Sequence, residues 1–327
     1  MVVWEALDAL SHQLELCKVD ATTRVVLLVD ASRTTAQLEV LRAAVARTRA
    51  ESIEVREIHS SYDQESAMLQ FLSASDVVIT AIEDGHLTEA ALAAANTVLR
   101  IHGDVAPQDF APHTNMARRV GALHDSVARA DTFFLTDGQG TELEVALAGS
   151  EVDFDHGIVS DEHRVGAFPS GWVRVVPNKH TARGQLVLMP GDSNLAAARV
   201  LSSPLRLVIE NDVITQIDGD SPDADVVRAL LEFPQESDAY GLAELTIGLN
   251  PAQQLDLFDS QRTVPHLARL LGGGVTIGFG DNLLADRPCS QTVSFAMPRR
   301  TVRVDDLPVV THGDLEGDFA PDVYELG

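Results

Sequence analysis

The segment Arg24–Val29 (RVVLLV) is an almost uninterrupted apolar run near the start of the chain. A run of this kind predicts a strand that is covered on both of its faces. Further short apolar segments follow at Ile53–Ile58, Asp76–Ala81 and Thr132–Thr136, with helical patterns between them. This alternation predicts an N-terminal α/β domain, a Rossmann-like layer with a parallel sheet and helices on its faces.

Helical spacing of apolar residues predicts the helices of this layer at Val3–Leu16, Thr34–Ala50, Gln64–Leu72, Thr88–Ala95 and Pro112–Ala130. The first strand is followed by VDASRTTAQ, which lacks the glycine pattern of a dinucleotide-binding turn. The sequence therefore favours no nucleotide cofactor at this end of the sheet, and we expect no other cofactor.

After Asp137 the chain changes to short alternating strands separated by glycine-rich turns. Asp223–Phe233 is the exception and predicts a helix, with Ser221 as its cap and Pro222 in its first turn. We therefore predict an α+β domain with antiparallel strands at residues 136–327, after an α/β domain at residues 1–135. The acidic tail that begins at Asp305 is expected to be a loosely packed extension.

The 327-residue chain has a formal net charge of −25, which disfavours phosphate backbones and anionic lipid surfaces as partners. No apolar run approaches the roughly 18 residues of a membrane span, and the first residues do not resemble a signal peptide. The only cysteines are Cys17 and Cys289, so a reducing compartment is expected. We expect a cytoplasmic protein that binds neither nucleic acid nor membrane. The sequence leaves the formation of a homodimer undecided.

Two glycine-punctuated strands are predicted at Ala243–Leu249 and Gly274–Gly280, with a short helix at Ser260–Leu271 between them. Glycine allows backbone to approach another group closely, so strands that end in such turns favour a cleft. Glu244 in the first strand and Thr276 in the second are candidates for facing it.

A series of segments matches known motifs in the same order: Leu135–Leu147, Phe168–Pro177, Thr181–Leu188, Leu242–Pro251, Gly272–Asn282 and Ser290–Asp305. Together they resemble the thermophilic aminopeptidase T family, which also includes the non-haem iron 2,5-dihydroxypyridine dioxygenases. The resemblance extends over roughly Ala130–Asp305 and only loosely over the N-terminal layer. It implies that the cleft lies where the family binds its metal.

The same resemblance implies that most of the metal ligands are replaced. The ligand positions of the family correspond here to Trp172, Glu244, Thr276, Thr292 and Ser294. Of these only Glu244 is a ligating residue, and a divalent metal needs several converging nitrogen or oxygen ligands. The resemblance therefore implies a divergent member with a metal-free cleft.

Other groups of residues in the sequence leave an enzymatic function possible. His266, His312 and Asp314 could form the two-histidine, one-carboxylate set of an iron dioxygenase or a metallohydrolase. His312 follows the segment Val302–Asp306, however, and so lies later than the ligand pair of the family. Glu244 could instead be the general base of a metal-free enzyme. The acidic segment Asp153–His163 could bind a metal, and we favour a loop there.

We therefore expect a catalytically silent, aminopeptidase-like protein that binds a peptide in an interdomain cleft. The peptide could be a precursor in natural product biosynthesis, an expectation based on analogy alone. Trp172 is the expected principal contact, because a large rigid aromatic contributes most per side chain. The other expected contacts are Glu244, Thr276, Thr292, Ser294 and His113.

Overall fold

The structure is a computed structural model that describes residues 2–30, 35–58, 72–81, 94–101, 115–251 and 268–322. His113, His266 and most of the helices predicted at residues 64–72, 88–95 and 260–271 lie outside the described residues. No described helix is long and apolar enough to cross a membrane.

The chain forms two compact units, and each is described by itself. Unit 1 comprises Met1–Ala117 and Asp155–Ser170, and unit 2 comprises Arg118–Phe154 and Gly171–Gly327. The sequence predicted a single division after residue 135. The observed units differ because strand β5 (Thr132–Thr136) pairs with antiparallel strands of unit 2, whereas β8 (Val165–Phe168) adds to the parallel sheet of unit 1.

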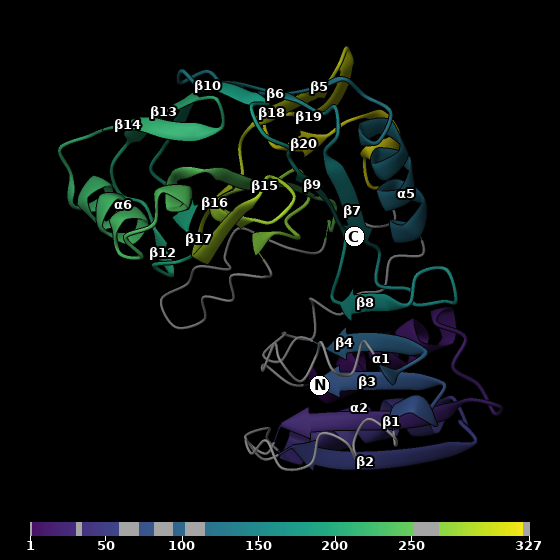
Figure 1. Ribbon diagram of the computed structural model, residues 1–327. Helices are drawn as coiled ribbons and strands as arrows, with labels where there is room; N and C mark the ends of the chain where they lie inside the picture. Colours follow the sequence, from purple (N-terminus) through teal and green to yellow (C-terminus); the bar gives the residue numbers. More distant parts are fainter. Residues whose placement is uncertain are drawn as a thin grey trace. The chain divides into compact units, whose positions relative to one another are not determined.

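Unit 1 contains a parallel sheet in the order β2-β1-β3-β4-β8 (Figure 1). The bounds of its first strands are β1 (Arg24–Asp30), β2 (Ser52–Ile58), β3 (Val77–Ala81) and β4 (Thr97–Ile101). This confirms the predicted parallel layer. Strand β4 was not predicted, and Arg100 interrupts its apolar run.

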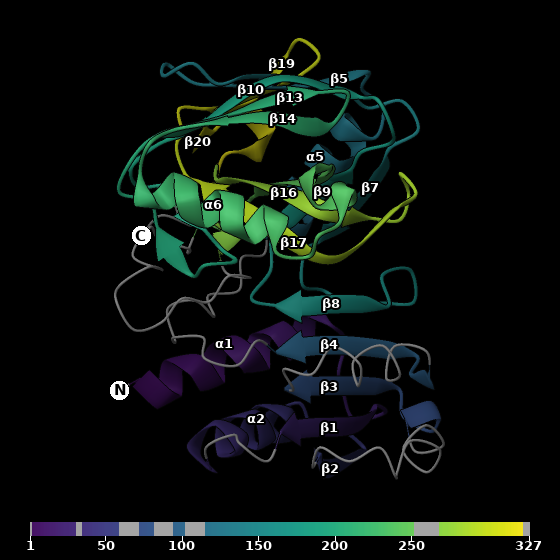
Figure 2. The same ribbon diagram turned by 60° about the vertical axis from the view of Figure 1, so that its left-hand side comes forward.

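Helices α1 (Val2–Leu16) and α2 (Thr35–Arg47) share one core with the sheet (Figure 2). Val25, Leu27 and Val29 of β1 belong to this core. Val26 and Leu28 belong to a second core on the opposite face. Both faces of β1 are therefore covered, which explains why its apolar run does not alternate.

Unit 2 contains two mainly antiparallel sheets, here called the β10 sheet and the β16 sheet (Figure 1). The strands of the β10 sheet are, in order, β14 (Val213–Asp218), β13 (Leu205–Glu210), β10 (Ala182–Leu188), β6 (Glu142–Ala146), β5, β18 (Thr301–Val304), β19 (Leu307–Thr311) and β20 (Asp314–Leu315). The strands of the β16 sheet are, in order, β12 (Arg199–Val200), β11 (Ser193–Asn194), β17 (Arg287–Met297), β16 (Val275–Asn282), β15 (Leu242–Gly248), β9 (Trp172–Val176) and β7 (Glu151–Asp155). The antiparallel α+β domain expected from the sequence is confirmed.

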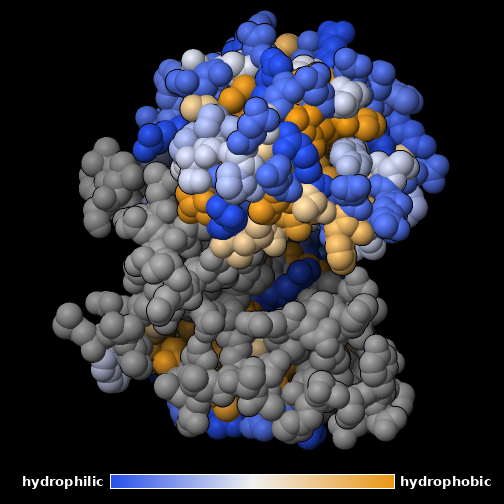
Figure 3. All heavy atoms as spheres, turned by 90° about the vertical axis from the view of Figure 1, so that its left-hand side faces the viewer, coloured by the Kyte–Doolittle hydropathy of each residue, from blue (hydrophilic) through white to orange (hydrophobic). Residues whose placement is uncertain are grey.

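The helices of this part are α5 (Met116–Val127) and α6 (Pro222–Glu232), with short 3₁₀ turns η3 (Ser237–Tyr240) and η5 (Gly317–Phe319). The predicted cap is present, because Ser221 Oγ accepts a hydrogen bond from Ala224 N at 3.3 Å. Figure 3 shows hydrophilic residues over most of the described surface of unit 2 that faces the viewer, as the net charge of −25 leads one to expect.

The prediction of a loosely packed tail after Asp305 is wrong for the described residues. Strand β19 pairs with β18, and β20 pairs with β19. Val309, Val310 and Phe319 are buried. The apolar residues of LPVV outweigh the surrounding acidic residues, since a strand needs only alternate apolar positions to join a sheet.

The two sheets of unit 2 are connected by a buried ion pair. Asp212 lies in the turn between β13 and β14, at a φ of 70°, and its side chain is fully buried. Its carboxylate accepts hydrogen bonds from the backbone N–H groups of His180, Thr181 and Ala182. It also pairs with Arg287 Nη2 of β17 at 2.7 Å. The turn of the β10 sheet is thereby attached to a strand of the β16 sheet.

Replacing Asp212 tests this connection. We expect Asp212→Ala to lower the free energy of unfolding by roughly 3–5 kcal/mol, because it leaves a buried guanidinium without its counter-ion. Asp212→Asn should lose less, since asparagine keeps an acceptor oxygen and tolerates a positive φ. Urea titration in a Trp4→Phe background would follow unit 2 through Trp172 fluorescence alone. Equal stability of the alanine variant and the parent protein would refute the connection.

Cys17, which follows α1 directly, is buried against the segment after β7, and its Sγ accepts from Val159 N at 3.4 Å. Burial raises the pKa of the Cys17 thiol to about 11. The folded state therefore favours the neutral thiol, and this contribution to stability declines as the pH rises from about 9 toward 11.

Thiol reactivity should follow from this. At about pH 8.5, well under about 1% of Cys17 is thiolate, so iodoacetamide should label Cys289 and spare Cys17. Peptide mass spectrometry before and after addition of urea would measure both sites. The Cys289→Ser variant is the control and should take up almost no reagent when folded. Equal labelling of the two cysteines in the folded protein would contradict the burial of Cys17.

Candidate functional site

The residues that the sequence singled out lie on one face of the β16 sheet. Cross-strand partners share a face, and so do alternate residues along each strand. Glu244 of β15, Gly278 of β16 and Ser294 of β17 are directly opposite one another. Trp172, Thr276 and Thr292 occupy the same face, through the pairs Trp172–Gly248, Thr276–Thr246 and Thr292–Gly280. The structure thus brings together the predicted site residues that it describes, and His113 lies outside the described residues.

Gly278 provides the space that these side chains share. A Cβ at this position would lie 2.9 Å from Glu244 Cγ, 3.1 Å from Thr292 Cγ2 and 3.2 Å from Ser294 Oγ. Contacts this close do not occur in well-packed proteins without a shift of the neighbours. The glycine therefore has a packing role here, and it allows the Glu244 side chain to lie across β16.

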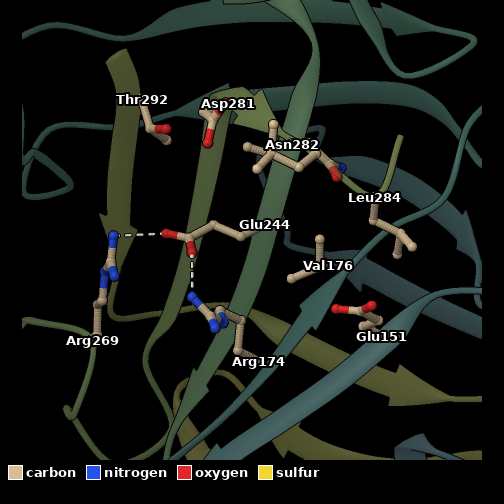
Figure 4. A pocket seen from close by; sticks show the side chains of 11 residues that line it. Glu151, Arg174, Val176, Glu244, Arg269, Asp281, Asn282, Leu284 and Thr292 are labelled. Atoms are coloured by element: carbon tan, nitrogen blue, oxygen red, sulfur yellow. Dashed lines mark ion pairs between the residues drawn. The ribbon is translucent and has the colours of Figure 1, made fainter. Parts of the chain in front are cut away.

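A pocket of about 600 Å³ opens on this face, within unit 2 (Figure 4). Its lining residues are Glu151, Arg174, Val176, Ala243, Glu244, Arg269, Asp281, Asn282, Leu283, Leu284 and Thr292. Its volume is in the range of small-molecule sites, roughly 300–1,000 Å³. Trp172, Thr276 and Ser294 share the face but do not line the pocket.

The sequence missed the two arginines at the centre of the pocket. Glu244 lies between them in Figure 4, with Oε1 2.7 Å from Arg269 Nη2 and Oε2 3.6 Å from Arg174 Nη1. The Glu244 side chain is only 10% exposed, whereas the arginine side chains are 37% and 34% exposed. Arg174 could have been found, because it follows Trp172 by two positions and so shares its face. Arg269 comes shortly after residues 252–267, which lie outside the described residues, and no local sequence pattern indicates its position.

Trp172 contacts Arg174, which lines the pocket. The Arg174 Cζ atom lies 5.5 Å from the centre of the indole ring, a cation–π distance. Arg174 also pairs with Asp153 at 2.8 Å. The indole and the Asp153 carboxylate therefore hold the guanidinium in place beside Glu244.

Several polar atoms on this face have no hydrogen-bond partner among the described residues. They are Glu244 Oε1, Thr246 Oγ1 and Arg174 Nε, all buried. Arg269 is close enough to Glu244 Oε1 to form an ion pair, but the contact lacks hydrogen-bond alignment. Buried polar groups are nearly always hydrogen-bonded, so unused donors and acceptors beside a pocket indicate capacity for a polar ligand.

The described residues around Glu244 do not form an iron site. Within the described parts of the chain, no three His, Cys, Asp or Glu side chains converge. The described side chains beside Glu244 are those of Thr292 and Ser294 and the two arginines. The facial triad typical of non-haem Fe(II) oxygenases consists of two histidines and a carboxylate, and cationic arginines oppose a metal cation.

The alternative ligands are placed elsewhere or not described. His312 and Asp314 are exposed at the turn between β19 and β20, in the β10 sheet, and neither lines the pocket. His113 and His266 lie outside the described residues. The structure therefore brings neither His312 nor Asp314 to Glu244.

The acidic segment Asp153–His163 has a structural explanation. The buried Asp155 carboxylate accepts from Gly157 N at 2.7 Å and from Ala167 N at 2.8 Å. His163 Nε2 is 3.6 Å from the same carboxylate. These contacts order the chain between β7 and β8.

Gly278 gives a direct test of the packing around Glu244. Gly278→Ala should displace the Glu244 side chain and lower the free energy of unfolding by roughly 1–3 kcal/mol, as overpacking does. Gly121→Ala is the matched control, because a Cβ at Gly121 in α5 meets nothing within 4 Å and should stabilise the helix by about 0.5–1 kcal/mol. Thermal unfolding of both variants measures the difference. A stable Gly278→Ala protein would show that Glu244 does not occupy this space.

Comparison with known proteins identifies the family. The sequence pattern of the NicX family, described as 2,5-dihydroxypyridine 5,6-dioxygenase, matches residues 5–317. The 2,5-dihydroxypyridine 5,6-dioxygenase of Pseudomonas putida KT2440 is 25% identical over 209 residues, which are 62% of this chain and 59% of that protein. The matched region thus spans less than two thirds of this relative's length.

Solved structures show the same fold. The 2,5-dihydroxypyridine dioxygenase of Pseudomonas putida KT2440 superposes with a TM-score of 0.81 at 20% identity, over 100% of both chains. AmpT from Thermus thermophilus superposes with a TM-score of 0.60 at 13% identity, over 95% of this chain and 99% of the other. The resemblance proposed from the sequence motifs is confirmed, and the chain belongs to the NicX family.

Proposed function

We propose that this member of the NicX family binds a small polar molecule in the pocket around Glu244 without using a metal ion. The observation behind the proposal is the pairing of Glu244 with Arg174 and Arg269. A metal-binding carboxylate has its charge balanced by the metal cation. Here two guanidinium groups balance it, and they would repel a divalent cation at the same place.

The size and lining of the pocket favour a small molecule. A volume of about 600 Å³ holds a compact organic ligand or a very short peptide, and a longer precursor peptide would extend beyond it. Peptide binding and catalytic silence, which the sequence suggested, remain proposals based on analogy with the aminopeptidase fold. Because Trp172 contacts Arg174 and does not line the pocket, we propose that it positions the arginine instead of stacking on the ligand.

A ring-cleaving dioxygenase is the second candidate. The observation in its favour is the family match across residues 5–317, together with the name of the Pseudomonas putida relative. The ligand set suggested from the sequence was His266, His312 and Asp314. Because His266 lies outside the described residues, the misfit between the site and iron concerns the described residues alone.

Metal content separates the two candidates. Protein purified without chelator should contain well under one equivalent of Fe, Zn, Mn or Co, and EDTA should leave its melting temperature unchanged. A tightly bound metal would stabilise the fold by mass action, so that its removal would lower the melting temperature. Mass spectrometry of the elements and a thermal scan with and without EDTA provide the data.

An activity assay completes this test. Protein incubated anaerobically with Fe(II) and then supplied with oxygen and 2,5-dihydroxypyridine should leave the absorbance of the compound unchanged. Stoichiometric metal that is lost in His312→Ala, together with consumption of the compound, would refute the metal-free proposal and establish the dioxygenase.

A further inference from the structure

The charges around Glu244 are unevenly matched. Arg269 and Arg174 each pair with this single carboxylate. The other acidic partner of Arg174 is Asp153, whose side chain is 53% exposed and therefore well screened by water. Among the carboxylates of the described residues, Arg269 pairs with Glu244 alone. Two guanidinium groups thus face one buried carboxylate, which leaves one positive charge in excess among these three groups, although Glu151 and Asp281 make the lining of the whole pocket net negative.

The geometry of the two pairs is poor. Arg174 Nη1 is 3.6 Å from Glu244 Oε2, which is too long for a hydrogen bond, and the closer contact from Arg269 is misaligned. Arginine binds carboxylates best through two parallel hydrogen bonds. Neither arginine makes such a pair with Glu244, and the hydrogen bond that Arg174 donates to Asp153 at 2.8 Å comes from Nη2 alone.

The unused atoms lie on adjacent strands. Thr246 is directly opposite Arg174 on the shared face, and its buried Oγ1 lacks a partner, as does Arg174 Nε. As whole residues, Thr246 is only 1% exposed and Glu244 is 8% exposed. Arg174 lines the pocket, so its Nε–H can donate to an acceptor ligand, and Arg269 supplies further donors from the other side of Glu244; Thr246 shares the face without lining the pocket.

From these contacts we propose that the pocket binds a small organic monocarboxylate, which Arg174 and Arg269 hold in competition with Glu244. The proposal deepens, and depends on, the metal-free function proposed above. A cationic ligand would be repelled by the two guanidinium groups. A dianion would exceed the positive charge available, since Glu151 and Asp281 also line the pocket and are exposed at its surface. A single carboxylate bound at the two arginines, away from Glu151 and Asp281, matches the one positive charge in excess beside Glu244.

Glu244 has a distinctive role in this arrangement. It is the resident anion of the site, and it must share the arginines with the ligand. Neutralising it should therefore strengthen binding of a carboxylate. If Glu244 instead contacted a ligand as an acceptor or a base, the same change would weaken binding, so that one substitution distinguishes the two roles.

The test compares acids with neutral isosteres in low-salt buffer. Benzoate and acetate, with benzamide and acetamide as the matched neutral probes, would be titrated calorimetrically into the full chain and assayed by thermal shift. We expect the acids to bind and the amides not to bind. Glu244→Gln should bind benzoate about tenfold more tightly, and Arg269→Gln about tenfold more weakly, each a change of ~1.4 kcal/mol. Arg269→Lys should recover part of the loss, because the charge remains while the paired donors do not.

Arg206→Gln is the control for net charge. Arg206 pairs with Asp218 in the β10 sheet and does not line the pocket, so benzoate affinity should stay unchanged in this variant. Unchanged or weaker benzoate binding in a folded Glu244→Gln protein would overturn the proposal. So would the absence of acid binding by both the parent protein and this variant.

Metal analysis of the same preparations shows whether the metal-free function or the carboxylate ligand is the proposal that fails. Stoichiometric metal would refute the proposed function itself. If the protein contains no metal and binds neither benzoate nor acetate, only the proposed identity of the ligand is refuted.

Discussion

The buried pair of Asp212 and Arg287 is the interaction on which the geometry of unit 2 depends most directly. It joins a turn of the β10 sheet to β17 of the β16 sheet, and Arg287 begins the strand that later carries Thr292 and Ser294. The backbone carbonyl of Asp212 also accepts from Leu242 N at 2.7 Å, at the start of the strand that carries Glu244. One buried residue therefore restrains both strands that flank β16 at the pocket.

The strand framework of the pocket sets its shape, and the side chains that the strands carry set its charge. The glycines and the register of β15, β16 and β17 hold Glu244 at the centre of the face. Beside it lie two guanidinium groups, Thr292 and Ser294. The similarity to a dioxygenase and to AmpT shows the fold, and the chemistry of the pocket has to be argued from its own side chains.

Much of the fold could be predicted because the signals are local. The uninterrupted run at residues 24–29 reflects burial of β1 on both faces, and the cap at Ser221 fixes the start of α6. The strand patterns at residues 243–249 and 274–280 were also enough to place Glu244 and Thr276 on one face. These features depend on residues within a few positions of one another.

The rest could not be predicted because it depends on contacts between distant segments. Arg269 is identified as a site residue only by its approach to Glu244, and strand β4 is stabilised by its neighbours although Arg100 interrupts its apolar pattern. The tail after Asp305 reads as acidic, yet β19 finds its partner in β18. The position of Asp212 at the joint between two sheets has no local signature either.

Residues 155–170 belong to unit 1, although the segments just before and after them belong to unit 2. This order affects how the chain can fold while the ribosome is making it. The edge strand β8 is followed by β9 of unit 2 and preceded by β5, β6 and β7, so the parallel sheet cannot be completed until the ribosome has passed residue 168. Until then β4 has a free edge, the kind of strand to which other chains add. Strands of unit 2 emerge before their own later partners, β15 to β19, have been made. A fragment that ends at residue 117 would therefore lack β8, and β4 would lose one of the two strands that pair with it among the described residues.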